Sequence, residues 1–168
     1  MRKTAAIAVV LVLILGGVLV YGLVNTHIKV ADAAVQVIPC SSYPDEFARL
    51  QAAAQQNSLV GTVFQQSIEG VAGEYSLLVY ELQLKNPGFL PMEMVELQVS
   101  PLAEDQLSYT EGSAEGAVPQ ITVGPGRTAT LRQVLMTKAT GMPRTVRDLY
   151  ITYYIWGNPF TAKYTFGT

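Results

Sequence analysis

Very few residues in this chain of 168 have the types needed for nucleophilic, acid–base or metal chemistry. It holds one histidine, His27, and one cysteine, Cys40. A Ser-His-Asp or Cys-His arrangement would have to use His27, and zinc sites of Cys and His need more ligands than these. The lone Cys40 leaves two interpretations, a buried free thiol or a bridge to another chain. We therefore expect no catalytic residues, no metal site and no cofactor.

The acidic residues do not supply a replacement site. Glu104, Asp105, Glu111 and Glu115 gather in two predicted loops but lack the spacing of a dedicated calcium loop, so we expect solvated charges. Residues 25–168 carry a net charge of about −4 without charge runs, so the basic footprint of a nucleic-acid binder is missing.

The strongest candidate for a binding surface is aromatic. If residues 149–156 form a strand that is followed by a turn at Asn158-Pro159, alternation places Leu149, Ile151, Tyr153 and Ile155 on one face. The other face would then present a row made of Tyr150, Tyr154 and Trp156. Such a row could stack on sugar rings or anchor a protein partner. The alternative is a structural role, in which both faces of the strand are covered or the row packs on a helix near residues 44–57.

The N-terminal segment, residues 4–24, determines where the rest of the chain lies relative to a membrane. Residues 4–24 read TAAIAVVLVLILGGVLVYGLV, without a charge, which is long enough for a transmembrane helix. Arg2 and Lys3 precede it, so the positive-inside rule predicts a cytoplasmic N-terminus at residues 1–3 and an extracytoplasmic C-terminal domain. The alternative is a cleaved signal peptide, with cleavage near Ala33 and secretion of the rest.

The remaining residues fit one domain, 42–168, after a stalk or first strand at 25–41. A helix is predicted near 44–57, where Pro44, Asp45 and Glu46 are typical of a first turn. Beyond it the apolar period changes from 3.6 to 2, with turn signals about every 8–12 residues. We therefore expect a mainly β protein, an antiparallel Ig-like β-sandwich of seven to eight strands with one short helix, after a single transmembrane helix.

Three motifs carry a resemblance: Leu84-Lys85-Asn86-Pro87 closing a strand, Gly124-Pro125-Gly126 before a Thr-rich strand, and an aromatic last strand pair. Over residues 74–166 the chain resembles the late-embryogenesis-abundant type 2 (LEA14-like, water-stress/hypersensitive-response) domains and related envelope domains. The resemblance implies a β-sandwich behind an N-terminal membrane anchor and a non-catalytic role, with no site residues.

These patterns together predict a single-pass membrane protein of the cell envelope that acts as a non-catalytic binding or assembly module. Its expected partners are the lipid bilayer, through residues 4–24, and an envelope protein. The alternative function is a glycan-binding module that recognises cell-wall saccharides through Tyr150, Tyr154 and Trp156. An uncharacterised enzyme is the third and least favoured hypothesis.

Overall fold

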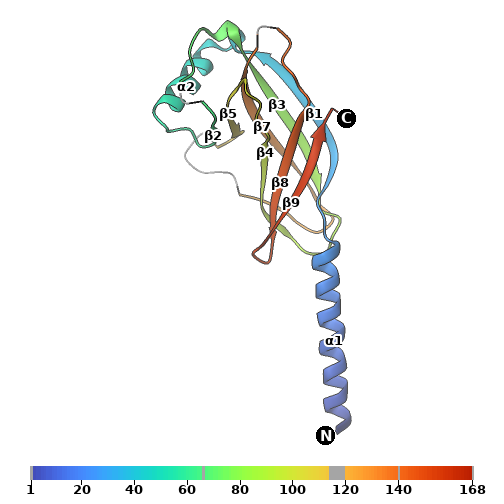
Figure 1. The fold of residues 1–168 in the computed structure, drawn as a ribbon. Helices are drawn as coiled ribbons and strands as arrows, with labels where there is room; N and C mark the ends of the chain where they lie inside the picture. The colour runs from blue at the N-terminus through green and yellow to red at the C-terminus, as the bar shows by residue number, and fades with distance from the viewer. Residues whose placement is uncertain (1, 66, 114–119, 140, 168) are drawn as a thin grey trace.

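A computed structural model describes residues 2–65, 67–113, 120–139 and 141–167 (Figure 1). These residues form two α-helices, α1 (Arg2–Asn25) and α2 (Pro44–Gln55), and nine strands. The strands are β1 (Lys29–Pro39), β2 (Thr62–Val63), β3 (Tyr75–Lys85), β4 (Met92–Val99), β5 (Asp105–Thr110), β6 (Ile121–Val123), β7 (Thr128–Lys138), β8 (Arg147–Ile155) and β9 (Asn158–Phe166).

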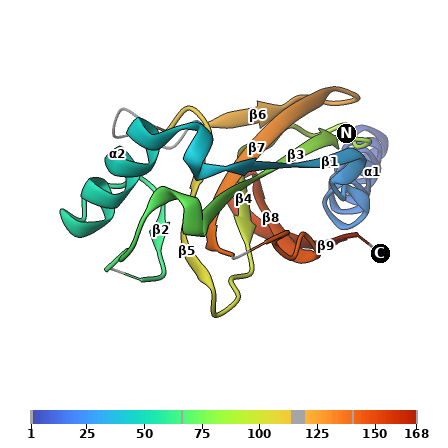
Figure 2. The same cartoon turned by 90° about the horizontal axis from the view of Figure 1, so that it is seen from above.

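The strands form two antiparallel sheets that pack face to face (Figure 2). One sheet has the order β1-β3-β7-β5-β2 and the other the order β6-β4-β8-β9. The expected antiparallel β-sandwich is thus confirmed. The expected number of seven to eight strands is wrong by one or two in the described residues. The additional strand is β1. The sequence predicts either a stalk or a first strand for residues 25–41.

β1 is an edge strand that pairs with β3 along almost its whole length, from Lys29↔Lys85 to Pro39↔Ser76. Its sequence gave a weak signal because a register shift between Val30 and Asp32 breaks the alternation. Pro39, which has no N–H to donate, stands at the end of the strand, as a proline in a sheet must.

The main core lies between the two sheets. Alternate residues of β3, β4 and β8 enter it, as the period of two predicts. The fully buried members include Leu78, Tyr80, Leu82 and Leu84 of β3 and Leu149 and Ile155 of β8. The predicted inward set of β8 is confirmed.

A second, smaller core lies between α2 and the outer face of the five-stranded sheet. Phe47, Leu50 and Ala54 of α2 are buried there, at the helical spacing seen in the sequence. They pack near Tyr75 of β3 and Met136 of β7. α2 therefore covers the five-stranded sheet, at the end of the molecule opposite α1 (Figure 1).

α1 extends away from the sandwich (Figure 1), and its described side chains are those of residues 7–22. They are mostly aliphatic and exposed, from Ile7 at 60% to Tyr21 at 67%. Among the residues described, neither helix combines the length and the hydropathy that a membrane crossing requires. That finding does not support the predicted span 4–24, which stays a prediction.

The junction between α1 and β1 is built into the sandwich. Thr26 and Ile28 are buried, whereas His27 between them is exposed. The Tyr153 hydroxyl of β8 accepts a hydrogen bond from the Ile28 N–H (3.4 Å) and faces the Thr26 carbonyl at 3.5 Å. The link between α1 and β1 is therefore packed into the sandwich.

Candidate functional site

The outer face of the four-stranded sheet carries two of the three predicted aromatic residues. Tyr150 is 37% exposed, and Tyr154 is half-buried. Across the sheet, Tyr150 stands opposite Gln98 of β4 and Lys163 of β9. Tyr154 stands opposite Glu93 and Pro159 in the same two strands. The surface thus combines two aromatic rings with polar and charged neighbours.

Trp156 does not belong to this row. It and Gly157 form the two-residue turn between β8 and β9, because Ile155 pairs with Asn158. Trp156 has φ 50° and Gly157 φ 75°, the left-handed values that a tight hairpin of this twist requires. The sequence prediction placed the turn at Asn158-Pro159, which is wrong. Pro159 is accommodated in β9 because that strand is a sheet edge.

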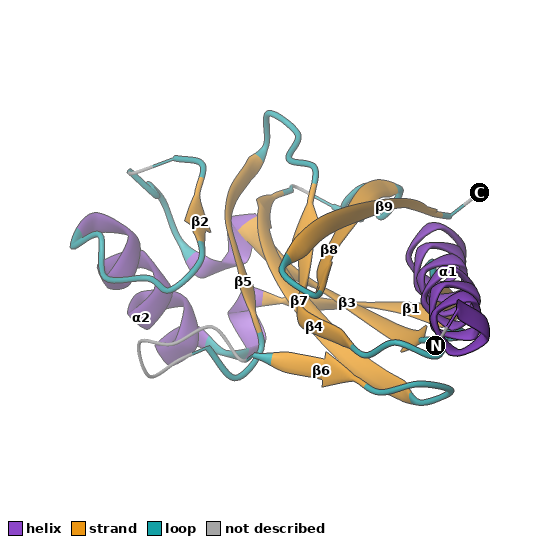
Figure 3. Ribbon diagram, turned by 90° about the horizontal axis from the view of Figure 1, so that it is seen from below, coloured by secondary structure: helices purple, strands orange, loops and turns teal. Residues whose placement is uncertain are grey.

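The alternative of a row packed on the helix near 44–57 is also wrong. α2 contributes to the second core, whose members come from β3, β5 and β7 and the segments beside them. Figure 3 shows α2 on the far side of the molecule from β8 and β9. No described helix lies over Tyr150 and Tyr154, so their face of the sheet is open.

The charges beside this row are partly neutralised within the sheet. Lys163 Nζ lies 2.8 Å from an Asp148 carboxylate oxygen, and the Thr165 hydroxyl donates a 2.7 Å hydrogen bond to the other. The Lys163 ammonium and this hydrogen bond hold the pKa of Asp148 below its ordinary value.

Tyr150 and Tyr154 are four residues apart on a strand, or about 13 Å, so a single sugar ring cannot stack on both. A partner that uses both rings must be extended.

His27 is exposed just before β1, and Cys40 follows directly after the other end of that strand. Cys40 is buried in the second core, and desolvation raises the pKa of its thiol to about 11. The thiol is therefore protonated and inert near neutral pH. Among the described residues, no three His, Cys, Asp or Glu side chains gather as metal ligands would.

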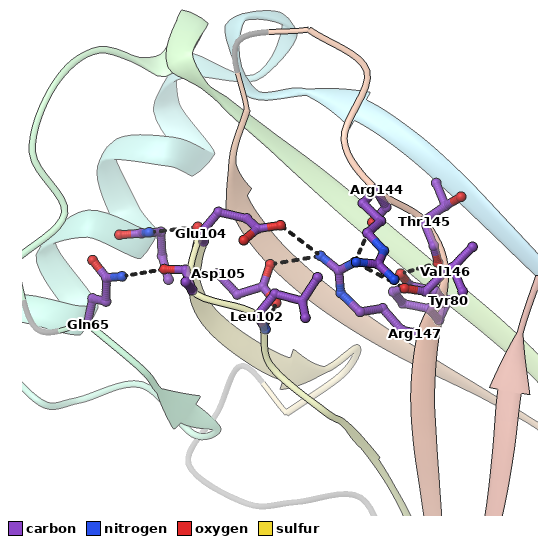
Figure 4. Close-up of polar contacts among 11 residues, drawn as sticks. Gln65, Tyr80, Leu102, Glu104, Asp105, Arg144, Thr145, Val146 and Arg147 are labelled. Atoms are coloured by element: carbon purple, nitrogen blue, oxygen red, sulfur yellow. Dashed lines mark hydrogen bonds and ion pairs between the residues drawn. The ribbon is translucent and has the colours of Figure 1, made fainter.

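One polar cluster was missed by the sequence analysis. Asp105 was expected as a solvated loop charge, but its side chain is fully buried and its Oδ1 lies 3.1 Å from Nη2 of Arg147, itself buried (Figure 4). Arg147 also donates to the Arg144 and Val146 carbonyls, and Asp105 Oδ2 accepts from the Leu102 N–H.

This ion pair joins the start of β5 in one sheet to the start of β8 in the other. Nothing in the local sequence distinguishes the two residues from ordinary charges at strand ends, because their burial depends on the packing of two distant loops. Glu111, the third predicted acidic residue, pairs with Arg132, and Glu115 lies outside the described residues. The pair is shielded from solvent and bridges the two sheets.

Two clefts of the described surface are lined by polar side chains. The larger, about 440 Å³, is lined in part by Glu81, Glu111 and Arg132, and the arginine pairs with both carboxylates. The other, about 180 Å³, lies at the sandwich edge between β4 and β5, with Gln98, Ser108 and Gln133 among its lining residues. The Gln133 amide donates to Ser108 and accepts from Thr110, so these polar groups satisfy one another.

Comparisons with known proteins add little to this geometry. No family model matches the chain, and no curated protein matches it. Among solved structures it is similar to a FixG-related protein from Vibrio parahaemolyticus, with 19% sequence identity over 79% of this chain and 91% of that chain. The TM-score is 0.37, so this similarity assigns neither a family nor a function.

Proposed function

We propose that the chain is a membrane-anchored, extracytoplasmic, non-catalytic binding and assembly module of the cell envelope. The observation that carries the proposal is α1, whose described aliphatic side chains at residues 7–22 are mostly exposed, while its Gly22 lies against Phe89 of the sandwich. A helix that is apolar all round is unstable in water and requires lipid or protein around it.

The fold fits a recognition module. The order β1-β3-β7-β5 corresponds to strands A-B-E-D of a constant-type immunoglobulin domain, and β4-β8-β9 corresponds to C-F-G. We therefore infer an Ig-like sandwich in which β2 and β6 are added at the edges. The LEA-type resemblance stays a prediction of the same non-catalytic role.

Retention of the anchor fits the structure better than cleavage near Ala33. Ala33 lies within β1, opposite Leu82 of β3, and packs against the main core. Cleavage there would remove Lys29–Ala33 from the strand, together with the buried residues Thr26 and Ile28. We therefore propose a single-pass protein with residues 1–3 inside and the sandwich outside.

The open face around Tyr150 is the proposed contact for an envelope protein partner. We would purify the full chain from detergent extracts and compare Tyr150→Ala with Tyr43→Ala, a tyrosine that is 57% exposed beside α2. A stoichiometric partner that Tyr150→Ala releases and Tyr43→Ala retains supports the assembly function. If both variants retain it, this face is not the contact.

A glycan-binding function has one observation in its favour, which is the exposure of Tyr150 on a strand with polar neighbours. It predicts that cell-wall saccharides retain the full chain on a column and that Tyr150→Ala weakens retention about tenfold, the loss expected for one stacking ring. Because Trp156 lies in the turn, Trp156→Ala should leave this retention unchanged.

A further inference from the structure

The end of the sandwich next to α1 has a composition unlike that of the rest of the surface. We define the α1 end as the three loops 86–91, 124–127 and 156–157 together with residues 26–28. Strand register places the three loops together, since Lys85 pairs with both Lys29 and Thr128, Met92 with Val123, and Glu93 with Tyr154. These segments contain no Asp or Glu.

Two large apolar side chains are exposed at this end, Phe89 at 48% and Trp156 at 51%. The ring of Phe89 packs directly on α1, because a Cβ at Gly22 would overlap it. Gly22 lies in the last turn of the uncharged run 4–24, so Phe89 stands at the level of the end of that run. The turn that holds Trp156 also reaches the level of the C-terminal turns of α1 (Figure 1).

Trp156 occupies its position at a conformational cost. A left-handed φ is unfavourable for a bulky side chain, and hairpins of this type prefer Asn, Asp or Gly there. Strain held at an exposed residue points to a function for that side chain.

The Lys and Arg residues of the domain also differ between the α1 end and the rest of the surface. Of the nine Lys and Arg residues after α1, five form ion pairs: Arg49, Arg132, Lys138, Arg147 and Lys163. In the described ranges the other four, Lys29, Lys85, Arg127 and Arg144, form none. Three of these four lie at or beside the α1 end.

Lys29, Lys85 and Arg127 form a row across neighbouring strands. Lys29 and Lys85 are direct cross-strand partners, an arrangement in which like charges repel. Arg127 is tied to the same place, since its carbonyl accepts the Asn86 N–H at 3.0 Å. All three side chains are exposed, and an anionic surface would relieve their repulsion.

We propose that the α1 end is a membrane-docking surface, in which Phe89 and Trp156 enter the interfacial region of a phospholipid bilayer and Lys29, Lys85 and Arg127 contact anionic headgroups. This inference rests on the proposed membrane anchoring by α1. Aromatic rings prefer the interface, and each cation near an anionic leaflet contributes about 1 kcal/mol, a factor of about five in the docking constant.

The surface is held in shape by Asn86. Its side-chain amide donates to the Leu90 carbonyl (2.7 Å) and to the Val123 carbonyl (2.9 Å), and its oxygen accepts from Gly88 N–H (2.9 Å). Loops 86–91 and 124–127 are thus fixed to each other. Together with the buried α1–β1 junction, these bonds keep Phe89 and the three cations close to the C-terminal end of α1.

Trp156 is the sole tryptophan of the chain, so its fluorescence reports on this surface without a label. We would reconstitute the full chain in phosphatidylcholine vesicles with and without phosphatidylglycerol. Quenching by lipids brominated near the top of the acyl chain would be compared with quenching by aqueous acrylamide. We expect strong quenching by the brominated lipids, weak quenching by acrylamide, and a larger lipid effect when phosphatidylglycerol is present.

The variant Lys29→Gln, Lys85→Gln, Arg127→Gln should remove the phosphatidylglycerol effect and weaken docking about fivefold per cation. Arg144→Gln, which removes an exposed unpaired cation at the other end, is the matched control and should change nothing. A phosphatidylglycerol effect that survives the triple substitution would overturn the headgroup assignment.

Co-flotation with the vesicles separates this inference from the anchor on which it rests. A chain that floats while acrylamide alone quenches Trp156 would overturn membrane docking and leave the anchor intact. A chain that does not float would overturn the proposed anchoring itself.

Discussion

The α1 end and the opposite, distal end of the sandwich are held together by different chemistry. We define the distal end as loops 100–104 and 141–146 with residues 40–43. Beside these loops the buried pair Asp105–Arg147 joins the two sheets, whereas Arg144 is exposed. At the α1 end the loops are joined by the neutral Asn86, and the cations point outward without partners in the described chain.

This difference assigns stability mainly to the distal end and recognition mainly to the α1 end. Asp105 and Arg147 satisfy each other inside the molecule, so changing this pair should affect folding first. The α1 end leaves Phe89 and Trp156 exposed, so changing them should affect binding and leave the fold intact. The four predictions below test this division in order of decreasing effect on stability.

The largest effect is expected for Arg147→Met at the distal end. It leaves the Asp105 carboxylate buried without its partner, which costs about 3–5 kcal/mol of unfolding free energy. Denaturant unfolding of the full chain in detergent, followed by circular dichroism, measures the loss. The double variant Arg147→Met, Asp105→Asn removes both charges and should recover at least half of it. A single variant within about 1 kcal/mol of the parent would contradict the role given to this pair.

Asn86→Ala should have the next largest effect. It leaves the Leu90 and Val123 carbonyls and the Gly88 N–H without their bonds at a buried position, a loss of about 2–3 kcal/mol. Asn158→Ala is the control, because the Asn158 amide makes only bonds of 3.4–3.5 Å. Equal losses from the two variants would show that Asn86 does not hold the α1 end.

Cys40 predicts a pH effect at the distal end. Its folded pKa is raised from an ordinary value of 9.0 to about 11, so the unfolded chain loses the proton first. The contribution of the buried neutral thiol to the free energy of unfolding is complete below pH 9. It is lost between pH 9 and 11, by roughly 2 kcal/mol. Burial also raises the pKa of Tyr80 and Tyr109 to about 12, so their contributions are lost only above pH 10. Measuring the free energy of unfolding of the parent chain and of Cys40→Ala between pH 9 and 10 isolates the effect of the thiol. If the two stabilities change with pH in parallel, the burial of the thiol is contradicted.

The smallest stability effect, with opposite sign, is expected for Trp156→Asn. Asparagine tolerates the left-handed conformation of the turn, so unfolding free energy should rise by about 0.5–1 kcal/mol. The fluorescence probe is lost with this substitution, so calorimetry of the full chain provides the measurement. A lower melting temperature would mean that the Trp156 ring stabilises the fold itself.

The sequence predicted those parts of the fold that depend on local periodicity. The inward residues of β3 and β8 and the buried face of α2 follow directly from periods of 2 and 3.6. β1 was uncertain because its bulge interrupts the alternation. The turn before β9 was misplaced because Asn158-Pro159 is a stronger turn signal than Trp156-Gly157, and only strand pairing shows which residues close the hairpin.

The candidate surfaces were less predictable because they depend on contacts distant in sequence. Trp156 was assigned to the Tyr150 row by alternation alone, although the strand ends one residue earlier. The cation row Lys29, Lys85 and Arg127 joins three separate segments, and no sequence motif links them. The same holds for Asp105 and Arg147, which look solvated until both loops are placed.

The central claim is that α1 anchors this sandwich to a bilayer, and flotation of the full chain with phosphatidylcholine vesicles after an alkaline carbonate wash tests it most directly. We predict that the unmodified chain floats with the lipid. The variant Leu11→Lys, Leu13→Lys, Leu15→Lys should not float, because each central lysine costs about 2.5–3.5 kcal/mol of insertion free energy. An unmodified chain that stays in the soluble fraction, folded by circular dichroism, would contradict the account.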